Sequence, residues 1–399
     1  MTSEPTPNVA ETAEALRRRT AALSGAPRRV VAALKQAGTI WRHRLENGWE
    51  PLEGSPFPFV QVRRSLEPLI PGLETADKWQ ARLIGDCIPE RGTGRVAALV
   101  LAGNTPLMAW SPLCACLLAG WAVYAKMSRD ETLWPRLFVD VLREADPEVA
   151  DLVHLDVWPG DDPRTADLVQ ATDAVVAYGS DATLAALRES TPPATPFFGH
   201  GHAVSIGLTV GEHWENNYNA SGFAHDVLMY EQGGCLSAQA VLFGANRERL
   251  LPFARALQQA CGVASFGLPV PADPAQTRLI REARDMALFD SATVYGDDEL
   301  RWTVIVHPQP RPMSTPTGFG VVEIIPIDAP ENFAAYLGPV RGCVSCVGIA
   351  GEITPALREA LAREGVSRIC KPGEMQTPPL DWPNGNRDLL VELASIGRP

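Results

Sequence analysis

The chain has no block of basic residues, although it carries 35 Lys and Arg beside 47 Asp and Glu. Its formal net charge is −12 at pH 7. Nucleic-acid binders gain much of their affinity by neutralising phosphates with clustered cations, so this charge argues against nucleic acid as a partner. It argues equally against binding to an anionic membrane surface.

Long apolar runs and abundant cysteine are missing as well. A membrane-spanning helix needs about 20 consecutive apolar residues, and no run approaches that length. The first eight residues contain neither a basic nor an apolar segment, so we expect no signal peptide. Eight irregularly spaced cysteines do not form a disulfide framework. We therefore expect a cytoplasmic protein with reduced thiols.

Common nucleotide and metal motifs are also absent. There is no P-loop, and Gly92-Thr93-Gly94 precedes a strand-like run instead of opening a helix, so it is not the dinucleotide fingerprint. Cys343 and Cys346 have the spacing of a zinc half-site, but no second pair or nearby histidine completes a tetrahedral set. We therefore expect no metal at these two cysteines, and we expect both to lie in a strand within a core.

What is present from residue 95 onward is an alternation of strand-like and helix-like segments. This rhythm predicts a parallel, doubly wound sheet with right-handed crossovers. Strands are expected at 95–102, 122–127, 152–157, 174–178, 204–210, 238–243, 301–306, 320–326 and 343–349. Helices are expected at 107–118, 181–189, 246–260, 331–337 and 354–364, and another is expected after Ser128, whose spacing to Glu131 is that of a capping box.

The first 90 residues and the last 30 have a different character. We expect a frayed tail over 1–12, a helix from Glu11 to about Ala37, and a loop over 48–60. Residues 62–86 look helical with a break at Pro71-Gly72, and 371–385 look extended. The predicted division is a helical segment 1–90, a first α/β domain 91–203, a second α/β domain 204–375 and an extended tail 376–399.

Cys235 is the strongest candidate for chemistry. It follows Gly233 and Gly234, between a helix expected to end at these glycines and the strand at 238–243. Residues without side chains would let the backbone turn tightly and a substrate approach the sulfur. The alternative is a buried structural cysteine, the commoner situation for this residue type.

Two polar residues are expected at the carboxyl edge of the sheet, where open α/β sheets bind ligands. Asn104 follows the first strand, and its amide could stabilise an oxyanion or merely bond its own turn. Lys126 ends the second strand; it could bind an adenosine ribose or a 2′-phosphate, or be solvated. Arg129 lies three residues on and offers a second cation, and Ser128 lies between them.

Two further segments are candidates for binding and proton transfer. Gly179-Ser180 opens the helix at 181–189, whose bare N-terminus would suit a pyrophosphate. His200 and His202 lie beside small residues before a strand. Either could exchange protons near neutral pH, and either could equally be a hydrogen-bonded structural residue.

The order of these motifs resembles the acyl-CoA reductases of the LuxC type, within the aldehyde dehydrogenase superfamily. The resemblance runs from about residue 90 to 390, and the first 90 residues share it only loosely. It is carried by AGNTP, AKMSRDE, YGS, FGHGHAVS, EQGGCLSAQ, RGCVSCVGIAG and SRICKPGEMQTPPLDW. It implies an aldehyde dehydrogenase-like α/β fold, with two doubly wound Rossmann-like domains and the active site between them. The domain at 91–203 would bind NAD(P), with the segment 1–90 packed on it, and the domain at 204–375 would be the catalytic one.

The resemblance also implies roles for single residues. Cys235 corresponds to the catalytic thiol and Asn104 to the oxyanion-hole asparagine. Lys126 corresponds to the lysine that contacts the adenosine ribose or 2′-phosphate, and Gly179-Ser180 to the turn near the cofactor phosphates. Glu323 matches the glutamate that bonds the nicotinamide ribose, although the usual Phe-Gly-Pro does not follow it.

One departure separates this chain from hydrolytic aldehyde dehydrogenases, which carry a water-activating glutamate upstream of the thiol. Residues 197–202 occupy that place here and contain no carboxylate. We therefore expect reduction of an acyl thioester, with NADPH as cofactor and NADH as the alternative. The acyl donor would be CoA, a carrier protein or an acylated partner enzyme, and a homo-oligomer is left open. Two other functions stay open: oxidation of an aldehyde to an acid or acyl-CoA, and a non-catalytic acyl-binding subunit.

Overall fold

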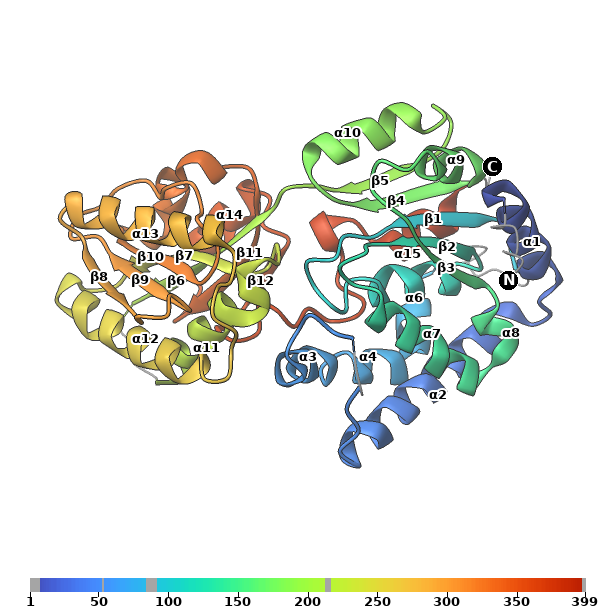
Figure 1. The fold of residues 1–399 in the computed structure, drawn as a ribbon, viewed down its shortest axis with the longest axis horizontal. Helices are drawn as coiled ribbons and strands as arrows, with labels where there is room; N and C mark the ends of the chain where they lie inside the picture. Colours follow the sequence, from blue (N-terminus) through green and yellow to red (C-terminus); the bar gives the residue numbers. More distant parts are fainter. Residues whose placement is uncertain (1–7, 52–53, 84–91, 212–216, 397–399) are drawn as a thin grey trace. The chain divides into compact units, whose positions relative to one another are not determined.

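A computed structural model describes residues 8–51, 54–83, 92–211 and 217–396. The chain divides into two compact units (Figure 1). Unit 1 consists of Met1–His202 together with Pro379–Pro399, and unit 2 consists of Ala203–Pro378. The predicted four-segment division stays a prediction, and its first boundary, at residues 90 and 91, includes residues outside the described part.

Unit 1 is built on a five-stranded parallel sheet in the order β3-β2-β1-β4-β5. Residues of β1 and β2 are buried without exception, as in strands covered on both faces. The helices α6 and α7 lie on one side of this sheet, and α9 and α10 lie on the other (Figure 1). The strands are β1 (Val96–Val100), β2 (Ala122–Met127), β3 (Val153–Val157), β4 (Ala174–Tyr178) and β5 (Phe197–His200).

The helices of unit 1 include one from the far end of the chain. That helix, α15 (Leu389–Ser395), packs against α6 and buries Leu390, Leu393 and Ala394. The others are α1 (Val9–Ala22), α2 (Ala26–Glu46), α3 (Phe59–Leu66), α4 (Ile70–Glu74), α5 (Ala76–Gln80), α6 (Trp110–Leu118), α7 (Leu133–Ala145), α8 (Pro147–Ala150), α9 (Arg164–Ala171) and α10 (Asp181–Ser190).

Unit 2 contains a seven-stranded sheet in the order β12-β11-β6-β7-β10-β9-β8, in which only the β8–β9 pair is antiparallel. The helices α11 and α12 cover one face, and α13 and α14 cover the other (Figure 1). The strands are β6 (Val204–Val210), β7 (Ala238–Gly244), β8 (Thr293–Gly296), β9 (Thr303–Val306), β10 (Val321–Pro326), β11 (Val344–Ala350) and β12 (Arg368–Cys370).

The helices of unit 2 are α11 (Asn217–Leu228), α12 (Leu250–Ala264), α13 (Pro274–Phe289) and α14 (Pro355–Arg363). Short 3₁₀ turns occur at Met229–Gln232, Arg247–Arg249, Pro330–Tyr336 and Gly338–Val340. Across both units, no helix in the described part of the chain is long and apolar enough to cross a membrane.

Several predicted elements differ from the observed ones near the N-terminus. The single helix expected from Glu11 to Ala37 is two helices, because Gly25 adopts a left-handed φ of 62° between them. The first of these begins at Val9, capped by the Asn8 side chain, so the expected frayed tail is helical from that residue. The expected break at Pro71-Gly72 is wrong, because Pro71 sits in the first turn of α4, where proline is tolerated. The part of the expected helix at 84–86 lies outside the described residues.

The predicted capping box at Ser128 is also wrong. The helix α7 begins five residues later, and the Ser128 hydroxyl instead accepts a bond from the Asp130 N–H at 3.2 Å. The Glu131 carboxylate caps the helix instead, by accepting a hydrogen bond from the Trp134 N–H at 2.9 Å. Sequence patterns did not predict β5, β8, β12, α9, α13 or α15.

Candidate functional site

The candidate catalytic and cofactor-binding residues of unit 1 lie at the carboxyl edge of its sheet. Asn104 follows β1, Lys126 lies in β2, Gly179 follows β4, and His200 ends β5. The strand order reverses direction between β1 and β4, which makes this the topological switch point where open α/β sheets bind ligands. The arrangement therefore brings these candidate residues to the same edge of one sheet.

Lys126 is buried, with 8% of its surface exposed, and pairs in register with Val100 of β1. Burial lowers the pKa of its ammonium, the nearby Arg129 lowers it further, and Asp130 opposes both effects. Gly103 lies so close to Ser128 that an added Cβ would come within 2.7 Å of the serine hydroxyl oxygen. The two loops that follow β1 and β2 are thus packed together at Gly103 and Ser128, and the charge of Arg129 acts on Lys126.

The helix after Gly179 is not bare at its N-terminus, contrary to prediction. The Ser180 side chain caps it by accepting from the Thr183 N–H at 3.2 Å. Asp181 follows in the first turn, and its carboxylate accepts from the backbone N–H of His202 at 3.0 Å. A pyrophosphate at this helix would have to displace the serine cap and approach a carboxylate, which weakens the case for this helix end as an anion site.

The two candidate histidines have different surroundings. His200 stacks on Tyr178 of the neighbouring strand, with ring centroids 4.6 Å apart and planes 13° from parallel. Burial lowers the pKa of its imidazole to about 4, and the charge of Arg387 acts in the same direction. His200 is therefore neutral at physiological pH and a weak base. His202 is tied by its backbone to Asp181.

Cys235 lies in unit 2, in the short connection between a 3₁₀ turn and β7. The helix α11 ends at Leu228, five residues before the first glycine, and Gly233 has an ordinary φ of −76°. The left-handed turn is made instead by three non-glycine residues, with φ of 54°, 52° and 61° at Tyr230, Glu231 and Gln232. Each costs on the order of 1 kcal/mol, and such strain persists only where the surroundings hold it.

Buried side chains hold that strained turn on both sides of Cys235. The Gln232 amide donates to the carbonyl oxygens of Ala238 at 2.7 Å and Val321 at 3.0 Å. The Ser205 hydroxyl of β6 donates to the carbonyl oxygen of Cys235 itself at 2.7 Å. The backbone that carries the thiol is thereby fixed to three strands of the sheet.

The Cys235 residue is exposed at the surface of unit 2. Protein atoms nevertheless surround its sulfur closely, and this burial raises the pKa of the thiol above its ordinary value. The buried structural cysteine that was the alternative is therefore not what the structure shows.

This raised pKa predicts how alkylation depends on pH. The rate of iodoacetamide labelling at Cys235 should keep rising with pH beyond the range in which an ordinary cysteine reaches its full rate, because only the thiolate reacts. Mass spectrometry of the labelled peptide isolates this thiol from the other cysteines, and Cys235→Ala is the control. A labelling rate that is already constant at about pH 7 would show that the site favours the anion.

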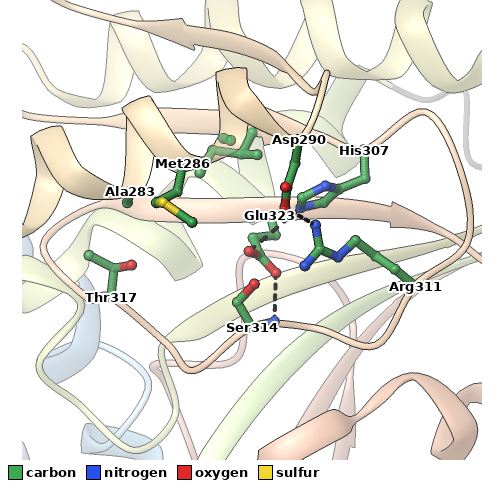
Figure 2. Close-up of a pocket in the computed structure, with 10 residues that line it drawn as sticks. Ala283, Met286, Asp290, His307, Arg311, Ser314, Thr317 and Glu323 are labelled. Carbon is green, nitrogen blue, oxygen red and sulfur yellow. Dashed lines mark hydrogen bonds and ion pairs between the residues drawn. The ribbon is translucent and has the colours of Figure 1, made fainter.

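Glu323 lines a pocket beneath α13, with His307, Arg311 and Ser314 around it (Figure 2). Its carboxylate accepts from the Ser314 N–H at 3.0 Å, and His307 Nε2 lies 3.5 Å from the other oxygen, longer than an ordinary hydrogen bond. Burial would raise the pKa of Glu323, but His307 and Ser314 outweigh it and lower the pKa. Sequence reasoning missed His307, which has no motif around it; its buried position at the end of β9 was the available signal.

Of the two cysteines with zinc-like spacing, Cys346 lies beside a third cysteine, Cys370. Cys346 is buried in β11, and its sulfur lies 3.8 Å from that of Cys370 in the neighbouring β12, not beside Cys343. Within the described ranges, no group of three or more metal-ligating side chains occurs. Cys114 and Cys116 are both fully buried in α6, where burial raises the pKa of each thiol.

Solved structures with the same architecture are aldehyde dehydrogenases. The aldehyde dehydrogenase KauB from Pseudomonas aeruginosa superposes with a TM-score of 0.71 at 12% identity, covering 94% of this chain and 82% of that one. An NAD-dependent aldehyde dehydrogenase from Sinorhizobium meliloti gives a TM-score of 0.68 at 15% identity, covering 91% and 78%. The chain therefore has an aldehyde dehydrogenase-like α/β fold, as predicted.

The family model described as acyl-CoA reductase (LuxC) matches residues 77–384. The chain belongs to this LuxC family, which confirms the resemblance seen in its motifs. Long-chain acyl-protein thioester reductases are similar to it. The one from Aliivibrio fischeri is 24% identical over 309 residues, or 75% of this chain and 62% of that protein. The one from Photorhabdus laumondii is 24% identical over 279 residues, or 69% and 57%. The chain thus spans less than two thirds of the length of these relatives.

Proposed function

We propose that this protein reduces an acyl thioester to the aldehyde through an acyl group carried on Cys235. The observation that carries the proposal is the exposed thiol on a strained, internally braced turn, in a chain of the LuxC family. The relatives are named for long-chain acyl-protein thioesters, so we infer a long acyl chain, delivered on CoA or on an acylated partner protein.

The proposed first half of the reaction uses the chain's own groups. The Cys235 sulfur bonds to the thioester carbonyl carbon, and the carrier thiol leaves with the proton that Cys235 gives up. We propose Asn104 and the Cys235 N–H as donors to the carbonyl oxygen while it carries negative charge. The product of this half is a Cys235 thioester, which preserves the energy of the original bond.

The second half needs a reductant. When bound, NADPH supplies the hydride that takes the acyl group to the aldehyde level, and the sulfur of Cys235 then leaves as the thiol. The carboxyl edge of the unit 1 sheet fits such a dinucleotide, because Lys126 and Arg129 supply two cations beside a strand switch point. Ser128, Gly179 and Ser180 are proposed to contact it there, and Glu323 to accept from its nicotinamide ribose. His200 and His202 remain candidates for proton transfer, His200 the weaker because its pKa is low.

Consumption of NADPH in the presence of a panel of acyl-CoAs and acylated proteins tests the proposed function. We expect one equivalent of aldehyde for each NADPH oxidised, with long acyl chains preferred. Rapid NADP-dependent conversion of a free aldehyde to the acid, without CoA, would instead establish an ordinary aldehyde dehydrogenase.

Replacement of Lys126 by alanine should weaken NADPH binding more than NADH binding. Loss of one charge-assisted contact to a 2′-phosphate predicts roughly a 10- to 100-fold rise in the NADPH dissociation constant, and only a small change for NADH. Fluorescence titration of both cofactors measures this. Lys78→Ala removes an exposed lysine of α5 and is the matched control. Equal affinities of the wild type for both cofactors would contradict the assignment of a phosphate to this lysine.

A further inference from the structure

The segment Lys371–Gln376 lies far from Cys235 in sequence but is bound to the elements that carry it. Asp226 of α11 is completely buried, and its carboxylate accepts from two backbone N–H groups of the segment, Gly373 at 2.6 Å and Met375 at 3.1 Å. An ionised carboxylate in the core is costly unless such donors satisfy it. The segment is therefore held to α11, the helix that leads into the strained turn.

The approach of this segment to α11 depends on a missing side chain. A Cβ at Gly222, one turn before Asp226, would collide with the backbone of Pro372 and Gly373. The glycine thus lets the segment lie directly on the helix, within reach of the carboxylate. A close approach of two backbone segments is a standard use of glycine.

The segment also contacts the loop that carries Cys235. The Gln376 side-chain amide donates a short hydrogen bond to the hydroxyl of Ser237, two residues after Cys235. Both partners are buried, with 6% of Gln376 and none of Ser237 exposed. The loop around Cys235 is therefore fixed from one side by Ser205 of β6 and from the other by Gln376.

We propose that Gln376 is a positioning residue for Cys235, acting through Ser237, and that Asp226 holds Gln376 in register for this task. The proposal rests on the proposed role of Cys235 as the nucleophile. Its physical basis is that attack on a thioester needs the sulfur in one orientation, and a displacement of 1 Å can cost about 10²-fold in rate. It also gives a function to SRICKPGEMQTPPLDW, one of the segments that carry the family resemblance: its Gln376 fixes the loop of Cys235 without contacting substrate.

Gln376→Met tests the proposal because methionine keeps the length of the side chain and removes its donor. We expect the rate constant for acyl-adduct formation on Cys235 to fall roughly 10- to 100-fold, with the acyl thioester KM within about twofold of wild type. Intact-mass measurement of single-turnover reactions gives this rate. Labelling by iodoacetamide, which tolerates many orientations, should change by less than about threefold.

Ser237→Ala and the double variant make the test specific. Both single changes break the same bond, so the double variant should be no slower than the slower single variant. Thr377→Ala is the control, because that hydroxyl bonds to Glu374 within the segment and should leave the rate unchanged. Asp226→Asn should lower the rate in the same direction as Gln376→Met.

Losses that multiply in the double variant would overturn the proposal, because they would show two independent effects. A wild-type acylation rate in Gln376→Met, with a lowered melting temperature, would make Gln376 purely structural. Neither result touches the proposed function, which is tested separately by adduct formation on Cys235 of the wild type and by NADPH-dependent release of aldehyde.

Discussion

Replacing Cys235 by alanine should abolish aldehyde formation while NADPH binding stays at the wild-type level. The thiol is the group proposed to carry the acyl chain, so its loss removes the covalent step and not the cofactor site. Removal of a catalytic nucleophile typically lowers turnover by about 10⁴-fold or more. The exposed position of the residue keeps the substitution from opening a cavity in the core.

The covalent acyl adduct on Cys235 can be measured directly by intact mass. Incubation of the wild type with an acyl thioester and without NADPH should add the mass of one acyl group, and the alanine variant should add none. Cys343→Ala is a matched control, since that partly exposed cysteine lies outside the strained turn. Turnover by Cys235→Ala comparable to that of the wild type would exclude Cys235 as the nucleophile.

A second large effect is expected at Glu131, which caps α7 in unit 1. The residue is 4% exposed, and in the described part of the chain its Oε2 has no hydrogen-bond partner. Burial raises the pKa of this carboxyl from 4.5 to about 7, although the N–H groups of Trp134 and Leu133 partly oppose the shift. Glu131→Gln keeps the capping oxygen and removes the charge.

The sign of the effect follows from the two protonation states. Below pH 4.5 the carboxyl is protonated in both the folded and the unfolded chain and costs nothing. As pH rises to about 7, the unfolded chain releases the proton that the folded chain still holds, and stability falls. The full cost above that pH is about 3 kcal/mol. Glu131→Gln should therefore increase the free energy of unfolding by about 3 kcal/mol at pH 8 and by under about 1 kcal/mol at pH 5.

Urea unfolding at the two pH values measures this difference. Tryptophan fluorescence suits the purpose, because most tryptophans of the chain belong to unit 1. Asp130→Asn removes an exposed charge one residue earlier and should show no such dependence on pH. An equal stabilisation by Glu131→Gln at both pH values would mean that the carboxyl titrates normally.

The strands of unit 1 were largely predictable because they are buried on both faces and form continuous apolar runs. Val96–Val100 is an example, in which every residue is buried. The helix α13 was not predictable in the same way. Only Ile280 and Ala287 are buried among its 16 residues, so it lacks the apolar stripe that marks a packed helix.

The sequence pointed to Cys235, but its prediction that Gly233 and Gly234 form the tight turn was wrong. Cys235 stands out in the sequence, but the tight turn belongs to Tyr230, Glu231 and Gln232 and not to the glycines. Hydrogen bonds such as that from Gln376 to Ser237 join residues 139 positions apart, and no local pattern predicts such a partner. Asp226, a carboxylate among the apolar residues of α11, was the one visible sign of a buried contact.

The return of the chain to unit 1 after Pro378 has a consequence for its synthesis. Unit 1 is begun first, but its last helix, α15, and the ion pairs of Arg82 with Asp381 and Asp388 depend on residues translated after all of unit 2. At about 5 to 20 residues per second, the ribosome needs roughly 10 to 35 seconds to pass through unit 2. For that interval the surface of α6 that α15 covers stays uncovered on the nascent chain, so the apolar contact between the two helices forms only after all of unit 2 has been translated.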